Sequence, residues 1–165
     1  MPNAAHLHLL VNHIPIIGSV FALLVLAWGL LRKSDDVVRT GLLAIFVIGL
    51  ISYGVQLTGE PAEEAVEHLA GVSRRVIHAH EEAAEVATWA MLATGLLALA
   101  SLVTWRGRRK LARALTFATL VVGLAGAGLM ARAGNLGGKI RHPEIDAAAA
   151  TQPAAEPGDD HGGER

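Results

Sequence analysis

Residues 14–31 read IPIIGSVFALLVLAWGLL, an apolar run without a charged side chain. A helix that spans the hydrocarbon core of a bilayer needs about 20 such residues. Three more runs are similarly apolar, and the four segments together are residues 14–31, 41–58, 86–105 and 111–131. Arg113, near the start of the fourth run, is the one charged residue within these segments. The pattern predicts four transmembrane helices.

Composition agrees with a membrane protein. Of 165 residues, 52% are hydrophobic and 18% are charged, and the mean hydropathy is +0.42. These values lie outside the usual range of soluble domains. Because the joints between the apolar segments are short, we expect an all-α, up-and-down bundle of antiparallel helices. Residues 1–145 should form this domain, and residues 146–165, rich in Ala, Pro, Gly and acids, a disordered tail.

The basic residues predict how the bundle is oriented, since short cytoplasmic loops retain Lys and Arg. Two joints hold eight of the 14 basic residues, namely Arg32, Lys33, Arg39, Arg106, Arg108, Arg109, Lys110 and Arg113. These joints should face the cytoplasm, which puts both termini and the middle joint on the outer side. We therefore expect a multi-pass protein of a bacterial inner membrane with both termini periplasmic.

All eight histidines fall on the predicted outer side: His6, His8, His13, His68, His78, His80, His142 and His161. Acidic residues gather there too, as they must where basic residues are retained on the other side. The retention of basic residues on the cytoplasmic side does not explain why all the histidines lie on the outer side. Several of them lie where a predicted helix begins. The outer face is therefore the candidate binding face.

His13 and His80 are the preferred ligands. His80 is in helical phase with Ala83 and Ala87, so it should point to the bundle interior, where an imidazole needs a hydrogen-bond partner or a metal. His13 lies at the edge of the first apolar segment, next to Pro15, which interrupts the helical hydrogen bonds. One ligand from each of two helices suits axial coordination of a haem. His8 and His142 are the second choices. In the alternative interpretation His13 lies among the lipid headgroups and His80 bonds a carbonyl.

The outer acids form two groups. His78, Glu81, Glu82, Glu85 and Trp89 recur at three- and four-residue spacing as one stripe, which is either a solvated face or, through Glu81, part of a metal site. A short interfacial helix is expected over residues 61–71, with Glu63 and Glu67 on its solvated face. Glu60, directly after the second segment, is expected to face inward. A single transition metal ion would then use His13, His80, Glu60 and Glu81.

A short motif at the start of the chain is similar to a known one. It is Leu7-His8-Leu9-Leu10-Val11-Asn12-His13-Ile14-Pro15. It resembles the opening of a group of uncharacterised bacterial four-helix inner-membrane proteins, a domain of unknown function, which typically reads Leu-His-Pro-Leu-Leu-Val-His-Phe-Pro. His8, His13 and Pro15 match, whereas Leu9, Asn12 and Ile14 depart from it. The segment Gly137-Gly138-Lys139-Ile140-Arg141-His142 is similar to a second motif near that group's end. The resemblance implies the four-helix fold and a haem-type site, but no reaction.

Absent residue types narrow the function. Without cysteine there is no thiolate zinc site and no covalent c-type haem. The segments lack the mid-membrane ionisable residues that a transporter normally uses, and topology already explains the arginines without nucleic-acid binding. Two classes remain: a redox or sensing protein with haem b or a transition metal ion, and a structural or accessory subunit without cofactor. A hydrolytic metal enzyme is a third class, so the sequence does not decide whether the protein is an enzyme. The partners expected are the lipid bilayer and either a homo-oligomer or a larger membrane complex.

Overall fold

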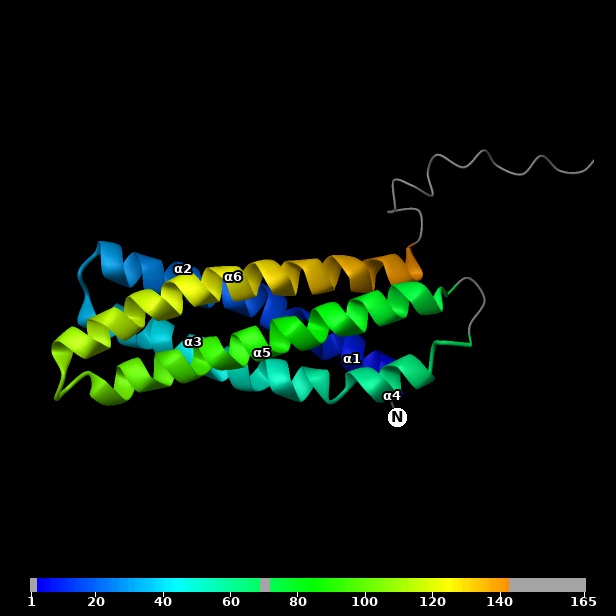
Figure 1. Cartoon of the computed structure of the whole chain (residues 1–165), viewed down its shortest axis with the longest axis horizontal. Coiled ribbons are helices and arrows are strands. Elements are labelled where there is room, and N and C mark those ends of the chain that lie inside the picture. The colour runs from blue at the N-terminus through cyan, green and yellow to red at the C-terminus, as the bar shows by residue number, and fades with distance from the viewer. Residues whose placement is uncertain (1–2, 69–71, 143–165) are drawn as a thin grey trace, which may run out of the picture.

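The computed structural model describes residues 3–68 and 72–142, and within them every regular element is an α-helix (Figure 1). The helices are α1 (Ala4–Val11), α2 (His13–Leu31), α3 (Asp35–Gln56), α4 (Gly59–Glu64), α5 (Arg74–Thr104) and α6 (Arg109–Arg141). Four stretches are long and apolar enough to cross a membrane: Ala4–Leu31, Asp35–Gln56, Arg74–Thr104 and Arg109–Ile140. The prediction of four long apolar helices is confirmed. The proposed tail and His161 lie outside the described residues.

The four long helices pack side by side with unusually close backbones. Helix α2 contacts α3 and α6, and α5 contacts α3 and α6. A Cβ added to Gly41 would lie 2.7 Å from Leu26 Cα, and one added to Gly49 would lie 2.8 Å from the Met91 carbonyl oxygen. Glycine is therefore required where α3 meets α2 and α5, as is common where membrane helices pack.

The core contains several hydroxyl side chains beside its apolar ones, and the outer surface is rich in large apolar side chains. The buried hydroxyls of Ser52, Thr94 and Thr119 each donate to the carbonyl four residues earlier, at 2.7–2.8 Å. In contrast, Phe21 is 68% exposed and Val103 is 74% exposed. In water such an outer surface would be a very large apolar patch. It is the surface expected of helices that face lipid.

Helices α5 and α6 extend further than the apolar segments predicted. The last apolar segment was predicted to end at residue 131, whereas α6 continues through Gly134 to Arg141. A Cβ at Gly134 would lie 2.8 Å from Ile16 Cδ1. This glycine therefore allows a close approach of α2 and does not act as a cap.

The first long helical stretch is interrupted at Asn12, between α1 and α2. Pro15 has no N–H, so the carbonyl of Val11 receives no hydrogen bond from it, which agrees with the local break expected there. Figure 1 shows α1 and α4 at one end of the bundle and the two basic joints, residues 32–34 and 105–108, at the other. Helices α1 and α4 contact each other. We call the first the histidine end and the second the basic end.

The prediction of a surface helix over residues 61–71 is wrong about where the helix begins and ends. Helix α4 runs only from Gly59 to Glu64, and turns follow to His68. It begins before Pro61, which occupies the first turn, where a missing N–H costs no helical hydrogen bond. Ala62 is the buried residue of this helix.

Candidate histidine site

His8 on α1 is held by the turn that follows α3. Its Nδ1 lies 2.8 Å from Thr58 Oγ1. The Thr58 hydroxyl donates its only proton to the Val55 carbonyl, at 2.6 Å. It must therefore accept from His8, whose Nδ1 then carries the proton. When the ring is neutral, its lone pair is on Nε2, a nitrogen that is able to bind a metal.

His80 on α5 is held in the same way by α6. Its Nδ1 lies 2.9 Å from the carbonyl oxygen of Ala133. Because a carbonyl only accepts, Nδ1 is again the donor and Nε2 retains the lone pair. A hydrogen bond of this kind from the second ring nitrogen is the usual support of a histidine ligand.

Gly137 brings the His80 ring against the α6 backbone. A Cβ at this position would lie 3.0 Å from His80 Cε1 and 3.3 Å from Nδ1. A larger residue would push the ring away from Ala133. The glycine therefore helps to fix the ring.

The two histidines also interact with each other. Both are half-buried, and they lie near enough for the charge of one to act on the other. Two imidazoles that are far apart in the sequence, each with Nδ1 bound and a lone pair on Nε2, thus lie within electrostatic reach. The pair can offer two neutral nitrogen ligands.

The other candidate ligands lie elsewhere. His13, the first residue of α2, is exposed, and so is His142, directly after α6. Glu60 was expected to face inward, and this is wrong, because it is exposed. His8 and His80 are the candidates that are half-buried at this end, whereas His13 is exposed. Within the described ranges, no group of three or more His, Asp or Glu residues is arranged to hold a metal ion.

Glu81 takes part in a second, separate cluster. Its side chain hydrogen-bonds with Glu63, and it lies 3.4 Å from His78 Nδ1. The hydrogen bond to Glu81, reinforced by burial and by repulsion between the two carboxylates, raises the pKa of Glu63 above its ordinary value. Glu67 interacts with Arg74 at 3.4 Å and with His68 at 3.1 Å. The prediction that Glu63 and Glu67 lie on a solvated face is therefore wrong, because both are half-buried beside charged partners.

Asn12 and Thr58 were missed by the sequence reasoning. Asn12 Oδ1 is buried and has no hydrogen-bond partner in the described chain. Asn12 lies one turn after His8, and it is one of the positions where the opening motif departs from the similar one. That departure was the available signal. For Thr58 the signal was weaker: it belongs to the first turn after an apolar run, where a hydroxyl commonly bonds the backbone.

Comparisons with known proteins add no relative. No family model, no curated protein and no solved structure matches this chain. The short opening motif thus stands as a resemblance, and the functional argument depends on the site itself.

Proposed function

We propose that this protein is a multi-pass, antiparallel four-helix bundle of a bacterial inner membrane, with both termini on the periplasmic side. The apolar outer surface and the buried hydroxyls support a lipid environment. The basic residues at the end opposite the histidines support the orientation. The lipid bilayer is then its first partner.

At the periplasmic end we propose a haem b site for redox chemistry or sensing, in which His8 and His80 would hold the group. The observation that supports it most is the matched hydrogen bonding of the two rings, which leaves both Nε2 atoms as donors to a metal. Haem iron already has four porphyrin nitrogens and needs two protein ligands at most. A lone transition metal ion commonly takes three or four. The count of available imidazoles therefore favours haem over a single ion.

A buried polar atom without a partner lies near His8 and bears on whether the site could hold a bound group. A buried amide oxygen without a partner normally has a bound water, ion or ligand to satisfy it. Asn12 Oδ1 is such an atom, one turn from His8. An added group at this end would give it a partner, so the residues present are compatible with one.

The optical spectrum of the purified full-length protein tests the proposal. We expect a Soret band that His8→Ala and His80→Ala each abolish or strongly shift. His6→Ala and His78→Ala are the matched controls, because they remove exposed histidines from the same two helices, α1 and α5. His13→Ala tests the competing ligand. If this variant loses the Soret band and His8→Ala keeps it, the ligand is His13 and not His8. His142→Ala tests the remaining candidate in the same way.

A structural or accessory subunit is the second candidate function. One observation favours it: His80 already ties α5 to α6 through Ala133 and lies tightly against Gly137. In that case the preparation is colourless and metal-free, and His80→Ala lowers thermal stability without any spectral change. A colourless preparation with one bound transition metal ion would instead support the single-ion site. Co-purification of a second copy or of other membrane subunits would identify the complex it serves.

A further inference from the structure

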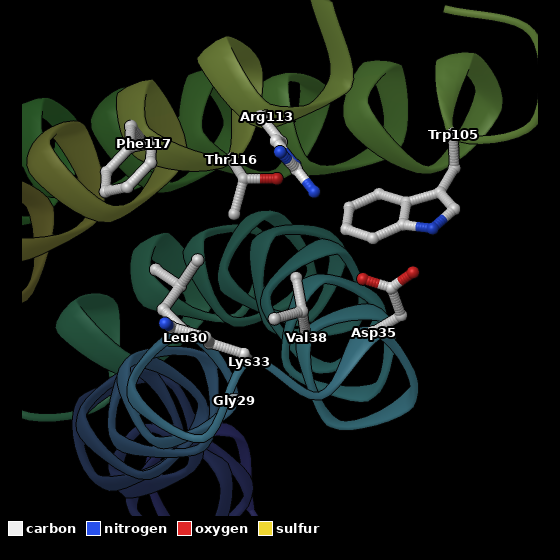
Figure 2. A pocket seen from close by; sticks show the side chains of 9 residues that line it. All are labelled: Gly29, Leu30, Lys33, Asp35, Val38, Trp105, Arg113, Thr116 and Phe117. Atoms are coloured by element: carbon white, nitrogen blue, oxygen red, sulfur yellow. The ribbon is translucent and has the colours of Figure 1, made fainter. Parts of the chain in front are cut away.

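A cavity lies at the basic end, far from the histidines. Its volume is about 310 Å³, and it lies between the joint after α2, the start of α3, and α6 (Figure 2). This size falls at the lower end of the range for small-molecule sites. Its walls combine two cations, Lys33 and Arg113, with the apolar side chains of Leu30, Val38 and Phe117.

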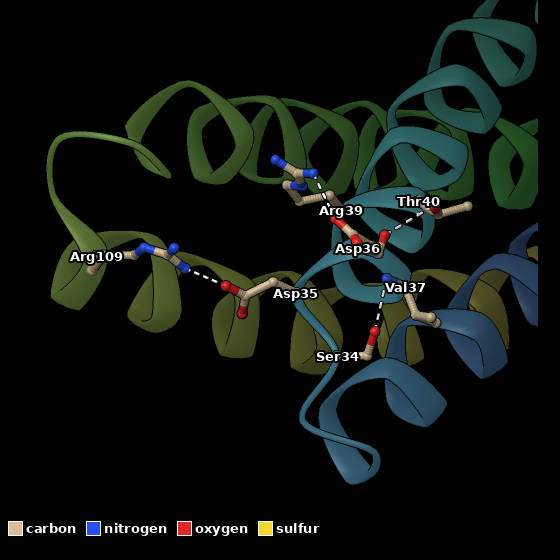
Figure 3. Close-up of polar contacts among 7 residues, drawn as sticks. All are labelled: Ser34, Asp35, Asp36, Val37, Arg39, Thr40 and Arg109. Carbon is tan, nitrogen blue, oxygen red and sulfur yellow. Dashed lines mark hydrogen bonds and ion pairs between the residues drawn. The ribbon is translucent and has the colours of Figure 1, made fainter.

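The two cations are available to a ligand. The acid at the cavity, Asp35, forms its ion pair with Arg109, a residue outside the lining (Figure 3). Asp36 is likewise bound by Arg39, at 2.7 Å. Among residues 3–68 and 72–142, neither Lys33 nor Arg113 forms an ion pair. Figure 2 shows the Arg113 guanidinium pointing into the space between α6 and α3, with Lys33 beside Leu30 on the opposite wall. Asp35 also attracts Arg113, but the two cations of the lining outnumber this one acid, so the lining has a net positive charge.

The backbone of Lys33 has a conformation that residues with a side chain rarely adopt. Its φ is 52°, and it is the one non-glycine residue with positive φ in the described chain. The joint is a Schellman turn, with Ser34 N–H bonded to the Gly29 carbonyl at 3.0 Å and Lys33 N–H to the Leu30 carbonyl at 3.2 Å. Glycine is the usual residue at this position, because it adopts positive φ without steric cost. A lysine held there despite that cost faces the cavity.

The apolar half of the cavity reaches the outer surface of the bundle. Phe117 lines the cavity and is 57% exposed on the side where α6 would face lipid. Trp105, a buried wall residue, is fixed beneath the Arg109 guanidinium, 5.5 Å from its ring centre. A ligand with an anionic head and an apolar chain could thus place each part against matching residues.

We propose that this cavity binds an anionic phospholipid of the inner leaflet, with its phosphate between Lys33 and Arg113 and one acyl chain along Phe117. The inference rests on the proposed membrane orientation, which places the basic end at cytoplasmic lipid headgroups. Arg and Lys pair well with phosphate oxygens, and basic pockets between membrane helices on that side are typical sites for anionic headgroups.

Native mass spectrometry of the full-length protein in detergent tests this inference. The probes are phosphatidylglycerol and phosphatidylcholine with identical acyl chains. We expect phosphatidylglycerol to bind the wild-type protein more tightly, and the Lys33→Ala/Arg113→Ala variant to bind it roughly tenfold more weakly, as the loss of one strong charge-assisted contact or more implies. Arg32→Ala/Arg106→Ala is the matched control, because it removes one exposed cation from each basic joint, at the same end of the protein, and neither residue lines the cavity.

A second variant protects the test against misfolding. Lys33→Gly removes the cation but suits the positive φ, so it should fold at least as well as the wild type and still bind phosphatidylglycerol more weakly. Equal binding of the two lipids, or equal loss in the Arg32→Ala/Arg106→Ala control, would overturn the proposal. Displacement of the lipid by millimolar inorganic phosphate alone would overturn it in favour of a free-phosphate site. These readouts do not depend on the Soret band, so failure of the haem proposal is seen separately.

Discussion

At the scale of single residues, the histidine end is organised by which atom donates and which accepts. Thr58 Oγ1 accepts a hydrogen bond from Nδ1 of His8, and the Ala133 carbonyl oxygen accepts one from Nδ1 of His80. These two bonds leave Nε2 as the ring nitrogen that could bind a metal. The acids beside this pair behave differently. Glu63 and Glu81 share a hydrogen bond that exists only while one of them is protonated.

We predict that Glu63 makes the protein less stable as the pH rises. The pKa of Glu63 is raised in the folded state, through its hydrogen bond to Glu81 and through burial, and it is lowered only in part by His78 and Arg74. The folded protein therefore holds this proton at pH values where the unfolded chain has lost it. Its stabilisation is complete below the ordinary glutamate pKa and is lost as the pH rises through the raised value.

Thermal melting of the detergent-solubilised protein from pH 4.5 to 7.5 measures this effect. Glu63→Gln keeps a hydrogen-bonding side chain without the charge, so it should raise the melting temperature at pH 7.5 and flatten the pH dependence. Glu64→Gln, an exposed neighbour on α4, is the control and should change neither. A Glu63→Gln curve parallel to that of the wild type would show that the two carboxyls do not share a proton.

At the scale of helices, a glycine matters for packing only where its backbone lies against another element. Gly137 and Gly138 are neighbours on α6, but only the first meets another element, because a Cβ at Gly138 would touch nothing within 4 Å. Alanine is a better helix former than glycine by about 1 kcal/mol. The two positions thus separate helix propensity from packing.

We predict opposite outcomes for Gly137→Ala and Gly138→Ala. The second should stabilise the protein by up to about 1 kcal/mol, since it gains helix propensity in open space. The first puts a methyl group 3.0 Å from His80 Cε1, which displaces the ring and breaks its bond to Ala133. A lost partner for a buried group costs about 1–3 kcal/mol, so the variant should be less stable than the wild type by up to about 2 kcal/mol after the gain in helix propensity. Melting temperatures of the two variants and the wild type compare them. Equal stabilisation by both would mean that the His80 ring is not held against α6.

The helices were predictable from sequence, but their ends and the histidine pair were not. Hydropathy marks only the apolar part of a helix, so it could not follow α5 back to Arg74 or α6 on to Arg141. The preference for His13 was based on its place at the edge of the first apolar segment, and hydropathy does not show the break at Asn12 that separates α1 from α2. The role of Thr58 depends on a contact between α1 and the turn after α3, which no local pattern contains.

At the scale of the whole molecule, the two ends of the bundle have different chemistry. The histidine end has paired imidazoles and carboxylates, and the basic end has a positively charged cavity bounded by two tight joints. The apolar surface between them carries large side chains such as Leu24, Leu96 and Val121. Both functional proposals therefore depend on which end faces the cytoplasm.

We predict that the basic end is cytoplasmic. Reporter fusions at Ser34 and Gly107, which lie in the two basic joints, should report the cytoplasm, because Arg and Lys in short joints are retained on that side. Fusions at Val72 and after Ile145 should report the periplasm. The control replaces the cations of the first joint, Arg32, Lys33 and Arg39, by Gln, which should weaken the retention and give mixed reporter signals. An inverted pattern in the unaltered protein would place the histidine end in the cytoplasm and the cavity at the outer leaflet. In that case neither the periplasmic haem site nor the inner-leaflet lipid site could stand as proposed.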